Sequence, residues 1–205
     1  MLLWRGVQSE RENELVGGLR VRGGRRFFSD LKLEFETFVD SATTLSAEYF
    51  QTKFEELENI DDSATRGRYF DYFVGLLFNQ LPDVNVVIGR EIATGEIDVF
   101  VACLDAPDWL HRLVGDATLL ENKWREKPTG TDDISVFHDK VTMATASCKV
   151  CYFVSISGFT SERNMGAEQL MQSKTDPKMV GWGREDVEEM VREGTPESLL
   201  RSHVM

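Results

Sequence analysis

The sequence is poor in the residues on which several enzyme classes depend. It has three histidines, His111, His138 and His203, and these are not spaced as metal ligands. A histidine-based zinc hydrolase and a Ser-His-Asp triad are therefore not expected. The sequence also lacks the G-x-S-x-G nucleophile elbow and the G-x-x-x-x-G-K-[ST] phosphate loop, which argues against those two routes of catalysis.

Cysteines and long apolar runs are scarce as well. The three cysteines include one C-x-x-C, Cys148 and Cys151, with no second pair of thiols and no nearby histidine, so two ordinary thiols are expected rather than a zinc site. An odd number of cysteines suits a reducing compartment. No apolar run approaches the roughly 20 residues that cross a bilayer, and the first residues lack the pattern of a secretory signal. We therefore expect a cytoplasmic protein that does not enter membranes.

Basic side chains are outnumbered, with 35 acidic against 23 basic residues and a net charge of −12. This balance argues against a broad electrostatic footprint for nucleic acid. It does not exclude a nucleic-acid enzyme, because a site that collects divalent cations carries acidic residues itself and local patches matter more than totals. Such basic patches are Arg20, Arg22, Arg25 and Arg26, then Arg66 and Arg68, then Lys123, Arg125 and Lys127.

The pattern divides the chain into three parts. Residues 1–28 contain glycine pairs at 17–18 and 23–24 among many charges, which predicts an irregular lead-in or linker. Residues 29–60 carry phenylalanines at helical spacing and predict two helices that form an arm, used in core packing or in a homodimer contact. Residues 61–205 form the main domain.

Helical and strand patterns alternate along the main domain. Asp62 or Ser63 caps a helix, and runs of β-branched residues predict strands at 84–92, 96–104 and 117–124, of which the first two make a hairpin. There follow a helix from Thr131 or Asp132, a strand at 149–157 that is apolar on both faces, a helix at 161–172, a short strand at 179–182 and a helix from Arg184. This order predicts an α/β sandwich with a mixed sheet.

Two neighbouring strands carry ionisable residues within apolar runs. In the second predicted strand, alternation places Ile97 and Val99 on one face and Asp98 on the other. In the third strand Glu121 and Lys123 share a face. A carboxylate within an apolar run costs free energy unless something compensates it, so both strands indicate a site.

Asp98, Glu121 and Lys123 are the minimum set for metal-assisted hydrolysis of a phosphodiester. Two carboxylates can hold Mg²⁺ or Mn²⁺, which stabilises charge on the phosphate and lowers the pKa of an attacking water, and a lysine can orient that water. The alternative for Glu121 and Lys123 is a solvated pair on an edge strand. Glu91 and Glu96 are alternative acids, for which solvent-facing positions in the hairpin are expected.

In chain order, a helix with an acid, a hairpin with an aspartate, and an E-x-K strand followed by a helix and an apolar strand resemble the PD-(D/E)xK nuclease superfamily. The resemblance covers about residues 62–160 and is to Mrr-like and other defence-associated restriction-endonuclease domains in particular. It implies a restriction-endonuclease-like three-layer sandwich, in which helices flank a central mixed β-sheet, here with an N-terminal helical arm.

The resemblance implies a role for each residue of the motif. Asp98 and Glu121 match the two acidic metal ligands, and Asn122 would offer its main-chain oxygen to the same metal. Lys123 matches the catalytic lysine. Asp71 stands where many members have a glutamate on the first core helix, which helps to order metal-bound water or a second metal.

Two positions depart from the family pattern. Ile97 replaces the proline that names the motif, a common change, and Asp71 is shorter than the usual glutamate, so a helix-surface position stays open for it. The resemblance implies a Mg²⁺- or Mn²⁺-dependent endonuclease, with DNA favoured over RNA, as the effector of a prokaryotic defence or restriction system. Because no DNA-reading motif is present, target choice is expected from a partner or a fused sensor domain. The alternatives are a catalytically inactive domain that binds nucleic acid or protein, and a helical interaction module.

Overall fold

A five-stranded mixed sheet forms the centre of the computed structural model, which describes residues 37, 44–93, 95–144, 147–161 and 166–202. The strands lie in sequence order, and they are β1 (Asn85–Ile92), β2 (Gly95–Ala102), β3 (Ala117–Lys123), β4 (Val150–Ser155) and β5 (Lys178–Trp182). The β1–β2 and β2–β3 pairs are antiparallel, whereas β3–β4 and β4–β5 are parallel. The predicted α/β class with a mixed sheet is therefore confirmed.

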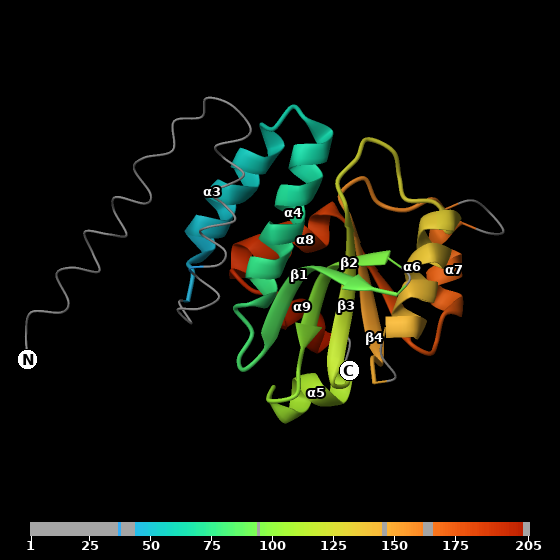
Figure 1. Cartoon of the computed structure of the whole chain (residues 1–205). Coiled ribbons are helices and arrows are strands. Elements are labelled where there is room, and N and C mark those ends of the chain that lie inside the picture. Colours follow the sequence, from blue (N-terminus) through green and yellow to red (C-terminus); the bar gives the residue numbers. More distant parts are fainter. Residues whose placement is uncertain (1–36, 38–43, 94, 145–146, 162–165, 203–205) are drawn as a thin grey trace, which may run out of the picture.

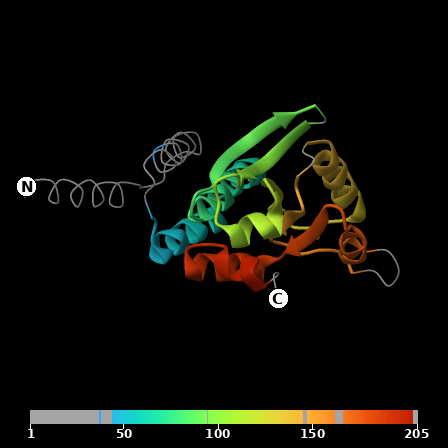
Figure 2. The same ribbon diagram turned by 90° about the horizontal axis from the view of Figure 1, so that it is seen from below.

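Helices cover both faces of this sheet (Figures 1 and 2). One face packs against α3 (Ala47–Glu58), α4 (Ser63–Phe78), α8 (Arg184–Glu193) and α9 (Glu197–Ser202), and the other against α6 (Thr131–Ala144) and α7 (Ala167–Ser173). A further helix, α5 (Asp108–Val114), lies at one end of the sheet in Figure 1. None of the helices in the described ranges combines the length and the apolar character that crossing a bilayer requires.

Local signals account for most element boundaries. The Asp62 carboxylate accepts a hydrogen bond from the Thr65 amide at 2.7 Å, which caps α4 where the sequence predicted a cap. The strands begin and end within two residues of their predicted bounds. Two helices were not predicted: α5 follows Pro107 in a segment expected to be a loop, and α9 is a short helix near the end of the described chain. Both are too short to show a helical period.

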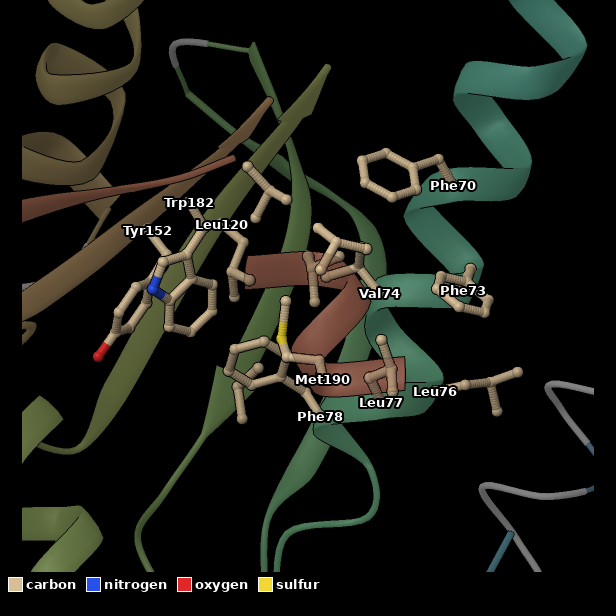
Figure 3. Packing of buried hydrophobic residues seen from close by; sticks show 14 of the residues in the cluster. Phe70, Phe73, Val74, Leu76, Leu77, Phe78, Leu120, Tyr152, Trp182 and Met190 are labelled. Carbon is tan, nitrogen blue, oxygen red and sulfur yellow. The ribbon is translucent and has the colours of Figure 1, made fainter. Parts of the chain in front are cut away.

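The larger core lies between the sheet and α4. Figure 3 shows Phe70 and Val74 of α4 extending toward the sheet, on which Leu120 is labelled. Tyr152 and Trp182 lie beside Leu120 in this view, and their rings stack with centroids 4.2 Å apart. Burial of such aromatic side chains stabilises a fold by about 1.5–3 kcal/mol each, so this layer anchors α4 against the middle of the sheet.

A second, smaller core lies beneath α6 and α7 on the other face. Phe137 of α6 meets Phe153 of β4 edge to face, with ring centroids 5.6 Å apart. Because both faces of the sheet are covered, all of β4 and nearly all of β3 are buried. β3 is the middle strand of the five, which excludes the edge-strand alternative for Glu121 and Lys123.

The second helix of the predicted arm belongs to this packed body. The larger core contains three buried side chains of α3, those of Phe50, Phe54 and Leu57. The ring of Phe50 meets that of Phe73 edge to face, with ring centroids 5.9 Å apart. These side chains are therefore occupied within the chain and are not free for a homodimer contact. The first predicted helix of the arm, like the lead-in at 1–28, falls outside the described residues, apart from residue 37.

Candidate functional site

The β2 strand is irregular at Asp98. Ile97 and Val99 pair with Arg90 and Ile88 of β1, but Asp98 between them does not pair with Gly89, the residue opposite it. Gly89 has a positive φ of 63°. On one side of this break Ile97 packs in the core beneath α6, while on the other side Val99 packs in the core beneath α4. The predicted shared face of Ile97 and Val99 was therefore wrong, because alternation holds only in a regular strand.

The separation of β2 from β3 gives Asp98 its partner. β2 pairs with β3 from Val99 to Ala102, and this pairing does not extend to Asp98. Oδ2 of Asp98 instead accepts a hydrogen bond from the backbone N–H of Asn122 at 2.8 Å. On the other edge of β3, the Ile156 amide donates to the Lys123 carbonyl at 3.1 Å. Consecutive residues direct their backbone groups to opposite edges of a strand, so the carbonyl of Asn122 faces β2 and the region of Asp98.

Glu121 is held by two lysines. Its Oε1 lies 2.6 Å from Nζ of Lys123, and its Oε2 lies 3.1 Å from Nζ of Lys140. Lys123 also reaches Asp98 Oδ2, at 3.7 Å. The side chain of Glu121 is 9% exposed, that of Lys140 16% and that of Lys123 29%, so these charges are largely removed from water. Such a cluster is stable only because its members compensate one another.

Lys140 is a site residue that the sequence analysis missed. Besides Glu121 Oε2, its Nζ donates to the main-chain oxygen of Glu96 at 2.9 Å, which links α6 to the β1–β2 hairpin. A signal was present in the sequence. Lys140 follows Phe137 by three residues and precedes Val141, both buried, so it lies beside the apolar stripe of α6, where a lysine is unusual.

Asp71 also reaches the site, although it is shorter than glutamate. Its Oδ1 accepts a hydrogen bond from Nδ2 of Asn122 at 3.1 Å, and the residue is half-buried on the inner side of α4. The helix-surface alternative for Asp71 is therefore wrong. The five predicted residues come together around β3, whereas Glu91 and Glu96 are exposed, as expected for hairpin charges.

Burial shifts the ionisation of two acids of the site, Asp71 and Asp98. It raises the pKa of Asp71 to about 8, with repulsion from Asp98 adding to the effect. Burial, followed by repulsion from Glu121, raises the pKa of Asp98 to about 6. For Lys123, burial acts to lower the pKa, but attraction from Asp98 and Glu121 outweighs it and the pKa is raised. At neutral pH Asp71 is therefore protonated in the metal-free chain while Lys123 is charged.

The donor chemistry of the site fits a hard divalent cation, since every predicted ligand is an oxygen atom. Asn122 adds a buried side-chain oxygen, Oδ1, that has no hydrogen-bond partner in the described part of the chain. No three His, Cys, Asp or Glu side chains among the described residues are grouped to hold a metal ion by themselves. The predicted set differs from such a group because it combines two carboxylates, from Asp98 and Glu121, with a main-chain oxygen.

A depression of about 680 Å³ begins where β3 ends. It brings together two of the basic patches seen in the sequence, through Arg66 of α4 and through Arg125 and Lys127 after β3. Arg125 pairs with Asp133 of α6. The other lining residues are Glu58, Ile60, Asp61, Ser63, Glu126 and Pro128, so acidic and basic side chains are mixed on its walls.

Comparisons of the chain with protein-family models, with curated proteins and with solved structures found no match.

Proposed function

We propose that this chain is a metal-dependent endonuclease that hydrolyses phosphodiester bonds of DNA. The observation that supports it best is the meeting of Asp98, Glu121 and Lys123 at the point where β2 and β3 separate. Apolar side chains of similar size would stabilise the middle of a sheet at least as well as this charged cluster. A chemical role is the simplest reason to retain carboxylates and lysines there.

The residues present can divide the work of hydrolysis. A Mg²⁺ or Mn²⁺ ion held by Asp98, Glu121 and the main-chain oxygen of Asn122 would stabilise charge on the phosphate and lower the pKa of an attacking water. Lys123, whose raised pKa keeps it protonated, can neutralise charge that develops on the phosphate. Asp71 holds the Asn122 side chain through its hydrogen bond and so helps to position the strand that carries the ligands.

The restriction-endonuclease-like fold is part of the same proposal. Its support is the mixed sheet between two helical layers, with the aspartate on β2 and the E-x-K triplet on the adjacent β3. Arg66, Arg125 and Lys127 line the depression that begins where β3 ends, and these basic side chains would meet a nucleic-acid backbone that crossed it. By the same resemblance, we propose an effector of a defence or restriction system whose target is chosen by a partner or fused sensor domain.

Plasmid cleavage with and without Mg²⁺ or Mn²⁺ tests this function. Replacing Glu121 by Gln or Lys123 by Met should reduce the cleavage rate by roughly 100-fold or more. Matched controls change the same residue types away from the site: Glu91→Gln on the exposed face of β1 and Lys149→Met before β4 should cleave like the wild type. Thermal melting checks that all four variants are folded. Full activity of either site variant would refute the assignment.

A catalytically inactive domain that binds nucleic acid is the second candidate. The observation that favours it is that lysines occupy both oxygens of Glu121. It predicts that the wild-type chain binds labelled DNA or RNA in a gel-shift assay but cleaves neither at any concentration of Mg²⁺ or Mn²⁺. Cleavage that disappears in Glu121→Gln would eliminate this candidate.

A further inference from the structure

Lys140 approaches the site from the helical layer opposite α4. It is held between the Glu121 carboxylate, at 3.1 Å, and the carbonyl of Glu96, at 2.9 Å. Because the side chain of Lys140 is only 16% exposed, water has little access to these two contacts and competes weakly with them. The ammonium group is therefore a fixed positive charge within the site.

The two lysines around Glu121 differ in their second partners. Lys123 takes Oε1 and has a further carboxylate, that of Asp98, at 3.7 Å. Lys140 takes Oε2, and its other partner is a neutral main-chain oxygen. A carboxylate oxygen that accepts a hydrogen bond from an ammonium group attracts a second cation less strongly. Lys140 and a metal ion would therefore compete for Oε2 of Glu121.

We propose that Lys140 is an internal counter-ion that a divalent cation displaces from Glu121 when it binds. The inference rests on the proposed metal-dependent function and concerns the control of the same site. In the absence of metal, Lys140 neutralises Glu121 and keeps the buried carboxylate stable. On metal binding it retains its hydrogen bond to the Glu96 carbonyl, which leaves Oε2 to the cation.

The sign of the change in metal affinity distinguishes this role from a structural one. Removing a positive charge next to the binding position should tighten the binding of a divalent cation by roughly tenfold, since charges at such distances interact by more than 1 kcal/mol even at high effective dielectric. A lysine that merely supports the fold would leave metal binding unchanged or weaken it when removed. Without metal, the variant should melt at a lower temperature, and Mn²⁺ should raise its melting temperature more than that of the wild type.

Isothermal titration calorimetry of the full chain with Mn²⁺ tests the proposal. Lys140→Met and Lys140→Gln both remove the charge, and Gln keeps a hydrogen-bond donor in case Met prevents folding. Lys140→Arg keeps the charge and should bind Mn²⁺ like the wild type. Lys149→Met is the matched control, because Lys149 also donates to a main-chain oxygen, that of Arg112, but touches no carboxylate of the site.

The outcomes separate this inference from the proposed function. Tighter binding in both neutral variants, with no change in Lys140→Arg and Lys149→Met, supports the counter-ion, and the gain should disappear when Glu121→Gln is added. If the wild type binds Mn²⁺ and the neutral variants bind it equally or more weakly, the counter-ion role is wrong while the nuclease proposal stands. If neither the wild type nor any variant binds Mn²⁺, both are overturned.

Discussion

Replacing Asp71 by Asn should stabilise the metal-free protein, and more so as the pH rises. In the folded chain burial raises the pKa of Asp71 from 3.8 to about 8. Between these values the unfolded chain has an ionised Asp71 while the folded chain keeps it protonated, so folding takes up a proton. The stability of the wild type should therefore fall as the pH rises from about 4 to about 8 and level off above that.

The size of the effect follows from the same values. Each pH unit between the folded and unfolded pKa corresponds to about 1.4 kcal/mol, and roughly 4 such units set a ceiling of about 6 kcal/mol. Water reaches the half-buried side chain and screens part of its repulsion from Asp98, so we expect about 2–3 kcal/mol at pH 9. Asn is close to Asp in size and does not ionise at any of these pH values. The fall in stability between about pH 4 and 8 that Asp71 causes should therefore be absent from the variant.

Urea unfolding in EDTA, followed by tryptophan fluorescence at pH 4, 6, 8 and 9, measures the difference. Trp124 and Trp182 lie in the core that Asp71 borders and report its loss. The gain of Asp71→Asn over the wild type should be small at pH 4 and largest at pH 8 and 9. The exposed Asp105 provides the matched control, and Asp105→Asn should change stability little at any pH. A variant less stable than the wild type at pH 9, or a difference independent of pH, would contradict the proton uptake by Asp71 on folding.

Two further predictions concern the scaffold. Gly115→Ala should destabilise the fold by about 3 kcal/mol or more in urea unfolding, because the residue has a φ of 86° and an added Cβ would lie 1.8 Å from the main-chain oxygen of Ser147. Gly130→Ala, where nothing lies within 4 Å, should cost less than about 1 kcal/mol, and equal losses in the two variants would contradict this account. Burial raises the pKa of all three thiols, those of Cys103 and Cys148 to about 12. Iodoacetamide at pH 8 should therefore modify all three only after unfolding, and mass spectrometry that finds rapid modification of the native protein would argue against their burial.

Local features of the sequence were sufficient for the order of the strands and the longer helices, and for part of the site. Strand and helix periods depend on residues a few positions apart, and so does the cap at Asp62. For the same reason Glu121 and Lys123, two residues apart in one strand, could be placed on one face, where their side chains meet. Burial of β4 on both faces also follows from its run of apolar residues.

The tertiary structure decided which distant residues share the site. Asp71 meets Asn122 across 51 positions of sequence, and Lys140 meets Glu121 across 19, through the packing of α4 and α6 on opposite faces of the sheet. The same packing places α3 in the core. These contacts depend on strand order and helix docking, to which residues far apart in the chain contribute together, so no local pattern contains them. Even at Asp98 the irregularity involves two strands: the pairing is interrupted opposite Gly89, whose φ of 63° favours glycine, and Asp98 accepts the hydrogen bond of the Asn122 backbone amide from a third strand.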